Sequence, residues 1–120
     1  MRFYLISLRL PFVLVAVLGF AQTASEAAQM WTFCVASAPS GGEVWITDPF
    51  ASSSGRHALE LAMESTLKRR EGERVSAQCP QPSSDKVAVV NAQTTAIEFN
   101  RKLGAILHEV PERDVPDAGQ

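Results

Sequence analysis

The chain of 120 residues contains two cysteines, two histidines and one tyrosine. No C-x-x-C pair, glycine-rich phosphate loop or carboxylate-rich calcium loop occurs, so no motif points to a redox couple, a nucleotide or calcium. The spacing of the cysteines and histidines matches no short zinc module. We therefore expect no metal site and no cofactor.

An excess of positive charge is also missing. The sequence has 11 basic and 13 acidic residues and a formal net charge of −2. A protein that binds mainly nucleic acid needs clustered positive charge to neutralise phosphates. We therefore do not expect nucleic acid as the partner.

No apolar run reaches the roughly 20 residues needed to span a bilayer. The longest, residues 10–21 (LPFVLVAVLGFA), follows a segment that carries Arg2 and Arg9 and no acidic residue. This pattern is typical of a secretory signal peptide, and the small residues beyond it suit signal peptidase. We predict a signal peptide over residues 1–27, with cleavage after Ala27 or Ala21 and no stable membrane span afterwards.

Both cysteines remain after cleavage. Removal of 27 residues leaves 93, enough for one small domain, with Cys34 and Cys79 separated by 45 positions. An even cysteine count in a small exported domain favours an intramolecular disulfide. We expect a periplasmic or secreted protein that contains this bond.

Periodicity predicts five elements of secondary structure. Three segments are predicted to be strands, because apolar and polar residues alternate in them or β-branched and aromatic residues are frequent: 30–36, 43–50 and 74–79. Between the first two, residues 37–42 (SAPSGG) suit a hairpin turn. A helix is predicted over 56–71, with Gly72 as its stop. A second is predicted from Asp85 to Glu109, where apolar residues recur at steps of three and four: Val89, Ala92, Ala96, Phe99, Leu103, Ile106 and Val110.

The β-β-α-β-α order predicts an α+β fold in a single small domain over residues 28–110. We expect a three-stranded antiparallel sheet with both helices on one face. Residues 111–120 (PERDVPDAGQ) are polar and include two prolines. They are predicted to form a disordered tail.

Two serine patterns suggest catalysis. Ser65 and Lys68 form an S-x-x-K string, as do Ser83 and Lys86, but the K-T-G element of serine acyltransferases is absent and Ser65 lies inside a predicted helix. A triad would need a serine of residues 52–54 with His57 and Asp48, yet no G-x-S-x-G elbow is present. The sequence favours a non-catalytic protein, with a small cell-envelope hydrolase or transferase as the alternative.

Three features are candidates for partner binding. Trp31 and Trp45 lie on neighbouring predicted strands, where an outward-facing tryptophan would anchor a partner. The only basic cluster suits an anionic partner or a solvated helix end; it comprises Lys68, Arg69, Arg70 and Arg74. The stripe on the last helix suits either a core face or a dimer seam.

Together these features predict a small exported binding or accessory protein. We expect its partner to be a protein or a cell-envelope component. A homodimer formed through the last helix is a further alternative.

Overall fold

The computed structural model describes residues 29–116. The predicted signal peptide, residues 1–27, and residues 117–120 lie outside this range. The elements are, in chain order, β1 (Trp31–Thr32), β2 (Val35–Ser37), β3 (Glu43–Thr47), β4 (Phe50–Ala51), α2 (Arg56–Glu71), β5 (Ser76–Gln78), α3 (Lys86–Lys102), β6 (Ile106–Val110) and the short 3-10 helix η2 (Glu112–Asp114).

A mixed four-stranded sheet in the order β5-β2-β3-β6 forms the centre of the domain. Strand β2 is antiparallel to both β3 and β5, whereas β6 runs parallel to β3, from Glu43 opposite Ile106 to Thr47 opposite Val110. Strands β1 and β4 form a separate antiparallel pair. Parallel pairing needs a long crossover, and the chain between β3 and β6 supplies one that includes both helices.

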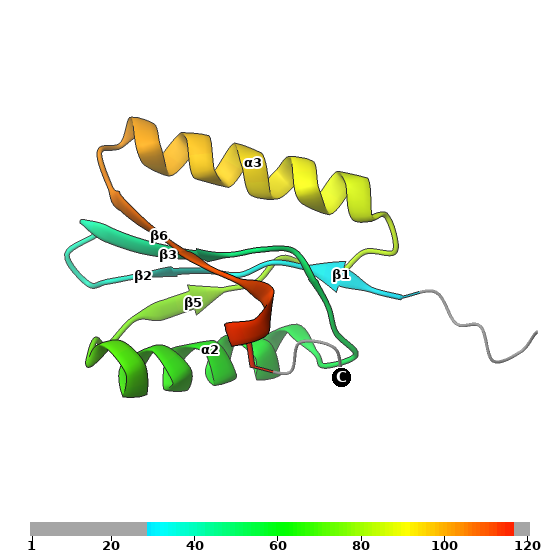
Figure 1. The fold of residues 1–120 in the computed structure, drawn as a ribbon, viewed down its shortest axis with the longest axis horizontal. Helices are drawn as coiled ribbons and strands as arrows, with labels where there is room; N and C mark the ends of the chain where they lie inside the picture. The colour runs from blue at the N-terminus through cyan, green and yellow to red at the C-terminus, as the bar shows by residue number, and fades with distance from the viewer. Residues whose placement is uncertain (1–28, 117–120) are drawn as a thin grey trace, which may run out of the picture.

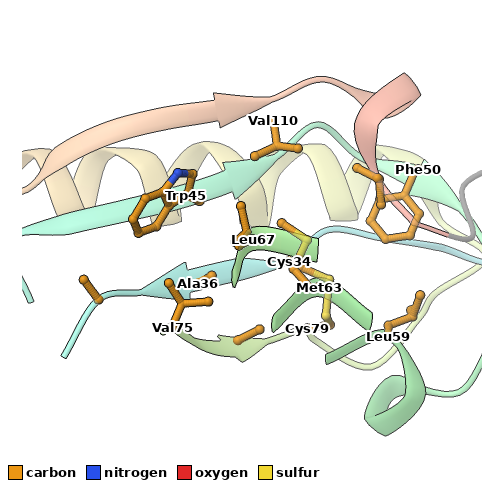
Figure 2. Close-up of a cluster of buried hydrophobic side chains, with 13 residues drawn as sticks. Cys34, Ala36, Trp45, Phe50, Leu59, Met63, Leu67, Val75, Cys79 and Val110 are labelled. Carbon is orange, nitrogen blue, oxygen red and sulfur yellow. A yellow bond between two sulfur atoms is a disulfide. The ribbon is translucent and has the colours of Figure 1, made fainter. Parts of the chain in front are cut away.

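The two helices cover opposite faces of the sheet (Figure 1). Val44 and Ile46 of β3 share a core cluster with Val89 of α3. Trp45, which points to the other face, shares a cluster with Met63 and Leu67 of α2 (Figure 2). Strand β3 is therefore buried on both sides, in a three-layer arrangement.

The predicted α+β class and single domain are confirmed, but the predicted sheet is wrong. A fourth strand, β6, occupies residues assigned to the end of the last helix, and the helices do not share one face. Helix α3 ends at Lys102, and Gly104 adopts φ +83°, a conformation that is unstrained only for glycine. The chain therefore turns back at Gly104 and runs along β3.

The helix ends follow local chemistry. Asp85 caps α3, its side chain accepting a hydrogen bond from the Ala88 N–H at 3.1 Å. Gly72 ends α2 as predicted, at φ +71°, and donates its N–H to the Lys68 carbonyl. The N-cap of α2 is Gly55, so this helix begins without a side-chain cap.

The predicted disulfide between Cys34 and Cys79 is present. Both cysteines are buried, and the bond joins the segment between β1 and β2 to the residue that follows β5. It therefore ties the first part of the chain to the region beside α2, within the larger core cluster (Figure 2).

Part of the segment assigned to a disordered tail packs on the domain. Residues 112–114 form η2, Val115 is buried in the larger core cluster, and Asp114 lies 3.8 Å from Arg70 of α2. The folded domain thus extends at least to Val115.

Candidate functional site

Both helices end at the same end of the molecule. Ser37 at the end of β2 pairs with Ser76, where the chain arrives from α2, and Glu43 at the start of β3 pairs with Ile106, where the chain arrives from α3. We call this the hairpin end: the β2–β3 turn (38–42), the last turns of α2 and α3 with the residues that follow them, and the starts of β3, β5 and β6. It lies on the left of Figure 1.

Positive charge collects at the hairpin end. Of the nine basic residues within 29–116, six lie in or just after the last turns of the two helices: Lys68, Arg69, Arg70, Arg74, Arg101 and Lys102. The first four were recognised in the sequence as one cluster. Arg101 and Lys102 were missed, because only the parallel β3–β6 pairing brings the end of α3 to this place.

Most of these cations have no acidic partner. Arg70 lies 3.8 Å from Asp114, and Arg69 donates a hydrogen bond to the Thr66 hydroxyl at 3.3 Å. Within residues 29–116, no other cation of the hairpin end has a carboxylate oxygen within 4.0 Å. The nearby Glu43 carboxylate is instead 2.7 Å from His108 Nε2. The cations therefore keep their charge available to a partner.

Three large apolar side chains are exposed at the same end. Phe99 is 60 % exposed, Leu103 66 % and Ile106 60 %. Phe99 and Leu103 are four positions apart, on one side of the end of α3, and Ile106 opens β6. Together with Lys68, Arg69, Arg74, Arg101 and Lys102, they form what we call the hairpin-end surface.

These apolar residues belong to the stripe that sequence periodicity assigned to a core face or a dimer seam. Of its seven members, only Val89 and Val110 are buried, and Ala92 is exposed as well. Because α3 stops at Lys102, the stripe is not a continuous helical seam. The prediction of one helical stripe over residues 89–110 is wrong.

Neither tryptophan forms an exposed anchor. Trp45 is 4 % exposed and stacks on the His108 ring, with 5.0 Å between ring centroids. Trp31 is half-buried beneath Lys86, whose Nζ lies 4.2 Å from the ring centroid. The tryptophans therefore act in packing, and the exposed apolar surface comes from α3 and β6.

The residues of the S-x-x-K strings lie in two settings. Ser65 and Lys68 line a hollow of about 370 Å³ beside α2, together with Arg74 and Leu61. Ser83 accepts a hydrogen bond from the Asp85 N–H at 3.0 Å, just before α3 begins. The second string is thus explained by the start of a helix.

The residues of the possible triad have separate local roles. Ser52 is buried, and its hydroxyl accepts the Ser54 N–H at 3.0 Å. Asp48 donates its backbone N–H to Val110 in the β3–β6 ladder, and His57 is exposed in the first turn of α2. Ser65 follows His57 by eight positions, which is about 12 Å along a helix.

Within residues 29–116, the structure contains no group of three or more histidine, cysteine, aspartate or glutamate side chains placed to hold a metal ion. Neither helix in this range is long and apolar enough to cross a membrane.

Comparison of the chain with models of protein families, with curated proteins and with solved structures found no match. The hairpin-end surface is therefore interpreted from its own residues.

Proposed function

We propose that the chain is an exported small binding or accessory protein without catalytic activity, located in the periplasm or secreted. The observation that carries this proposal is the exposure of Phe99, Leu103 and Ile106 beside cations that lack acidic partners. Exposed apolar side chains gathered in one place mark interaction sites more often than scattered ones do. The partner is a protein or another component of the cell envelope.

Two features support export. The N-terminal segment has the composition of a signal peptide. The Cys34–Cys79 disulfide suits an oxidising compartment, since cytosolic thiols are kept reduced.

Affinity capture tests the proposal. The exported, oxidised protein is immobilised and exposed to an envelope extract, in parallel with a Phe99→Ser/Leu103→Ser variant and a control, Val87→Ser/Val90→Ser. Val87 and Val90 are exposed in the first turns of the same helix, far from the hairpin end. We expect the wild type and the control to retain a component that the first variant loses. Equal retention by all three proteins, or by none, contradicts the proposal.

A small cell-envelope hydrolase or transferase is the second candidate, because Ser65 and Lys68 line one hollow. Covalent labelling decides this question. If Ser65 is an activated nucleophile, a fluorescent penicillin or fluorophosphonate will label the wild type but not the Ser65→Ala variant, and peptide mass spectrometry will place the adduct on Ser65.

A homodimer is the third candidate, with exposed Phe99 and Leu103 as its contact instead of a seam along residues 89–110. Sedimentation velocity tests it. A concentration-dependent dimer that the Phe99→Ser/Leu103→Ser variant abolishes would support this candidate, whereas a monomer at all concentrations would remove it.

A further inference from the structure

The charge of the domain is polarised along the strand direction. The hairpin end has six basic residues and four acidic ones, Glu43, Glu71, Glu73 and Glu98, whereas the rest of residues 29–116 has three basic and seven acidic ones. A protein that is acidic overall therefore presents one positive end. Such a distribution orients a molecule toward a negatively charged surface.

The cations stand on both sides of an uncharged turn. Helices α2 and α3 end on opposite faces of the sheet, and residues 38–42 (APSGG) between them bear no charge (Figure 1). A surface that meets the hairpin end therefore meets cations from the ends of both helices. Long lysine and arginine side chains extend from such positions to lipid headgroups while their stems rest on apolar surface.

The exposed apolar side chains lie on the α3 and β6 side of the same end. Phe99, Leu103 and Ile106 are the size and type of residue that peripheral proteins place at the boundary between headgroups and acyl chains. Basic residues around exposed Phe and Leu are typical of proteins that bind anionic membranes.

From these observations we infer that the hairpin-end surface binds anionic lipid membranes, with Phe99, Leu103 and Ile106 inserted and Lys68, Arg69, Arg74, Arg101 and Lys102 at the headgroups. This inference rests on the proposed binding function and names its partner. Complementation of the helix dipoles accounts for a basic residue in each last turn. It gives no reason for three large apolar side chains to stay exposed beside them.

A lipid surface fits these residues better than an acidic protein does. The cations come from two helices in different layers, and an acidic protein must match their separation with fixed carboxylates. A membrane offers negative charge at every position, together with an apolar layer at a constant depth below it. Both properties suit a surface whose charged and apolar parts lie at one end of the domain.

Vesicle cosedimentation tests the inference with the exported, processed and oxidised protein. The vesicles are phosphatidylcholine alone or a phosphatidylcholine–phosphatidylglycerol mixture. Each cation near an anionic membrane contributes about a five-fold change in partitioning. We expect Arg101→Gln/Lys102→Gln to weaken binding to the mixture on the order of 30-fold. The matched control, Arg56→Gln/Lys86→Gln, removes the same charge from the first residues of α2 and α3, at the opposite end of both helices. It is expected to change binding by about two-fold at most, because salt screens charges at this distance.

The apolar contribution is measured in the same assay. Phe99→Ser/Leu103→Ser is expected to weaken binding about ten-fold or more, since each buried methylene contributes to insertion, whereas Val87→Ser/Val90→Ser retains wild-type binding. Raising NaCl from about 0.1 M to about 1 M shortens the screening length from about 10 Å to about 3 Å and should also release the protein. Far-UV circular dichroism verifies that all four variants fold.

Three outcomes would overturn the inference: equal binding to both kinds of vesicle, no binding to either, or equal losses in the test and control variants. Binding to soluble polyglutamate without binding to vesicles would indicate an acidic protein partner instead. If the protein does not bind vesicles while its capture of an envelope component still depends on Phe99 and Leu103, only the assignment of lipid as the partner is wrong. If neither assay detects binding, the proposed binding function is wrong as well.

Discussion

The carboxylate of Glu64 is hydrogen-bonded to the backbone of Ala77: Glu64 Oε2 accepts the Ala77 N–H at 2.9 Å. One turn earlier on α2, Glu60 Oε2 accepts the Cys79 N–H at 3.0 Å. Side chains of the helix thus accept hydrogen bonds from the outer N–H groups of β5, an edge strand of the sheet, and of the residue that follows it. Unpaired edge donors promote pairing with other chains, so these two carboxylates help to close this edge.

Removing both carboxylates should destabilise the domain and open the edge. We expect Glu60→Ala/Glu64→Ala to lower the free energy of unfolding by on the order of 1 kcal/mol per lost hydrogen bond, as measured by urea denaturation. Size-exclusion chromatography should also reveal self-association. The control Glu71→Ala/Glu98→Ala removes the same charge from the two helices. A control that destabilises the protein equally would show that charge, and not edge capping, is responsible.

The disulfide should supply a large share of the stability. Cys34 and Cys79 are 45 positions apart, and closing a loop of this size restricts the unfolded chain by on the order of 4 kcal/mol in the chain-entropy account. We expect Cys34→Ala/Cys79→Ala, or reduction of the wild type, to lower the urea midpoint strongly. If reduction leaves the midpoint unchanged, the bond contributes nothing to stability.

Thr47 provides a buried hydrogen bond beside the disulfide. Its side-chain oxygen accepts the Cys34 N–H at 2.9 Å, and the residue is fully buried. Thr47→Val keeps the shape but leaves the Cys34 N–H without an acceptor, which costs about 1–3 kcal/mol. Thr47→Ser keeps the hydroxyl and should be milder. Denaturation curves that rank the serine variant below the valine variant would contradict this role.

Gly104 sets the end of α3 through its φ of +83°. A side chain in the left-handed region costs about 1–2 kcal/mol, so Gly104→Ala should lower the unfolding free energy by that amount. Gly42→Ala is the matched control. Its φ is not in the left-handed region, and the nearest atom to an added Cβ is Ser40 Oγ at an ordinary 3.6 Å. Calorimetry of the two variants should show a loss of thermal stability for Gly104→Ala alone.

Local signals were enough to predict several elements. Helix α2 has the predicted bounds, because Leu59, Met63 and Leu67 repeat every four residues and Gly72 provides a left-handed stop. The turn over 37–42 and the disulfide likewise follow from residue type and cysteine count. These features depend on short stretches of chain.

The errors arose where distant segments decide the structure. The i, i+3 and i, i+4 spacing of Leu103, Ile106 and Val110 imitates a helix, but parallel pairing with β3 makes this segment a strand. Gly104, which could have been read as a helix stop, was the available signal. The second signal was the sequence VWIT of β3. All four of these consecutive residues are buried, and such a run indicates a strand that is covered on both faces of the sheet.

The candidate site was only half visible in the sequence for the same reason. Lys68 to Arg74 form a run that can be recognised directly, whereas Arg101 and Lys102 join them only through the fold. Exposure of Phe99 and Leu103 follows from the rotation of α3 on the sheet, which places Val89 inward. The spacing of apolar residues along a helix does not show how the helix is rotated on the sheet, and so which of these residues face the core.

The parallel partnership of β3 and β6 also bears on when the domain folds. Glu43 and Ile106 are 63 positions apart, and β6 is the last strand described. Until residues 106–110 have been synthesised, β3 has a partner strand on one side only, and α3 lacks the part of the sheet that β6 forms. Non-local pairing of this kind forms late and slowly. The sheet therefore closes only after residues 106–110 have been made, so β3 and α2 wait for a strand that is encoded after α3.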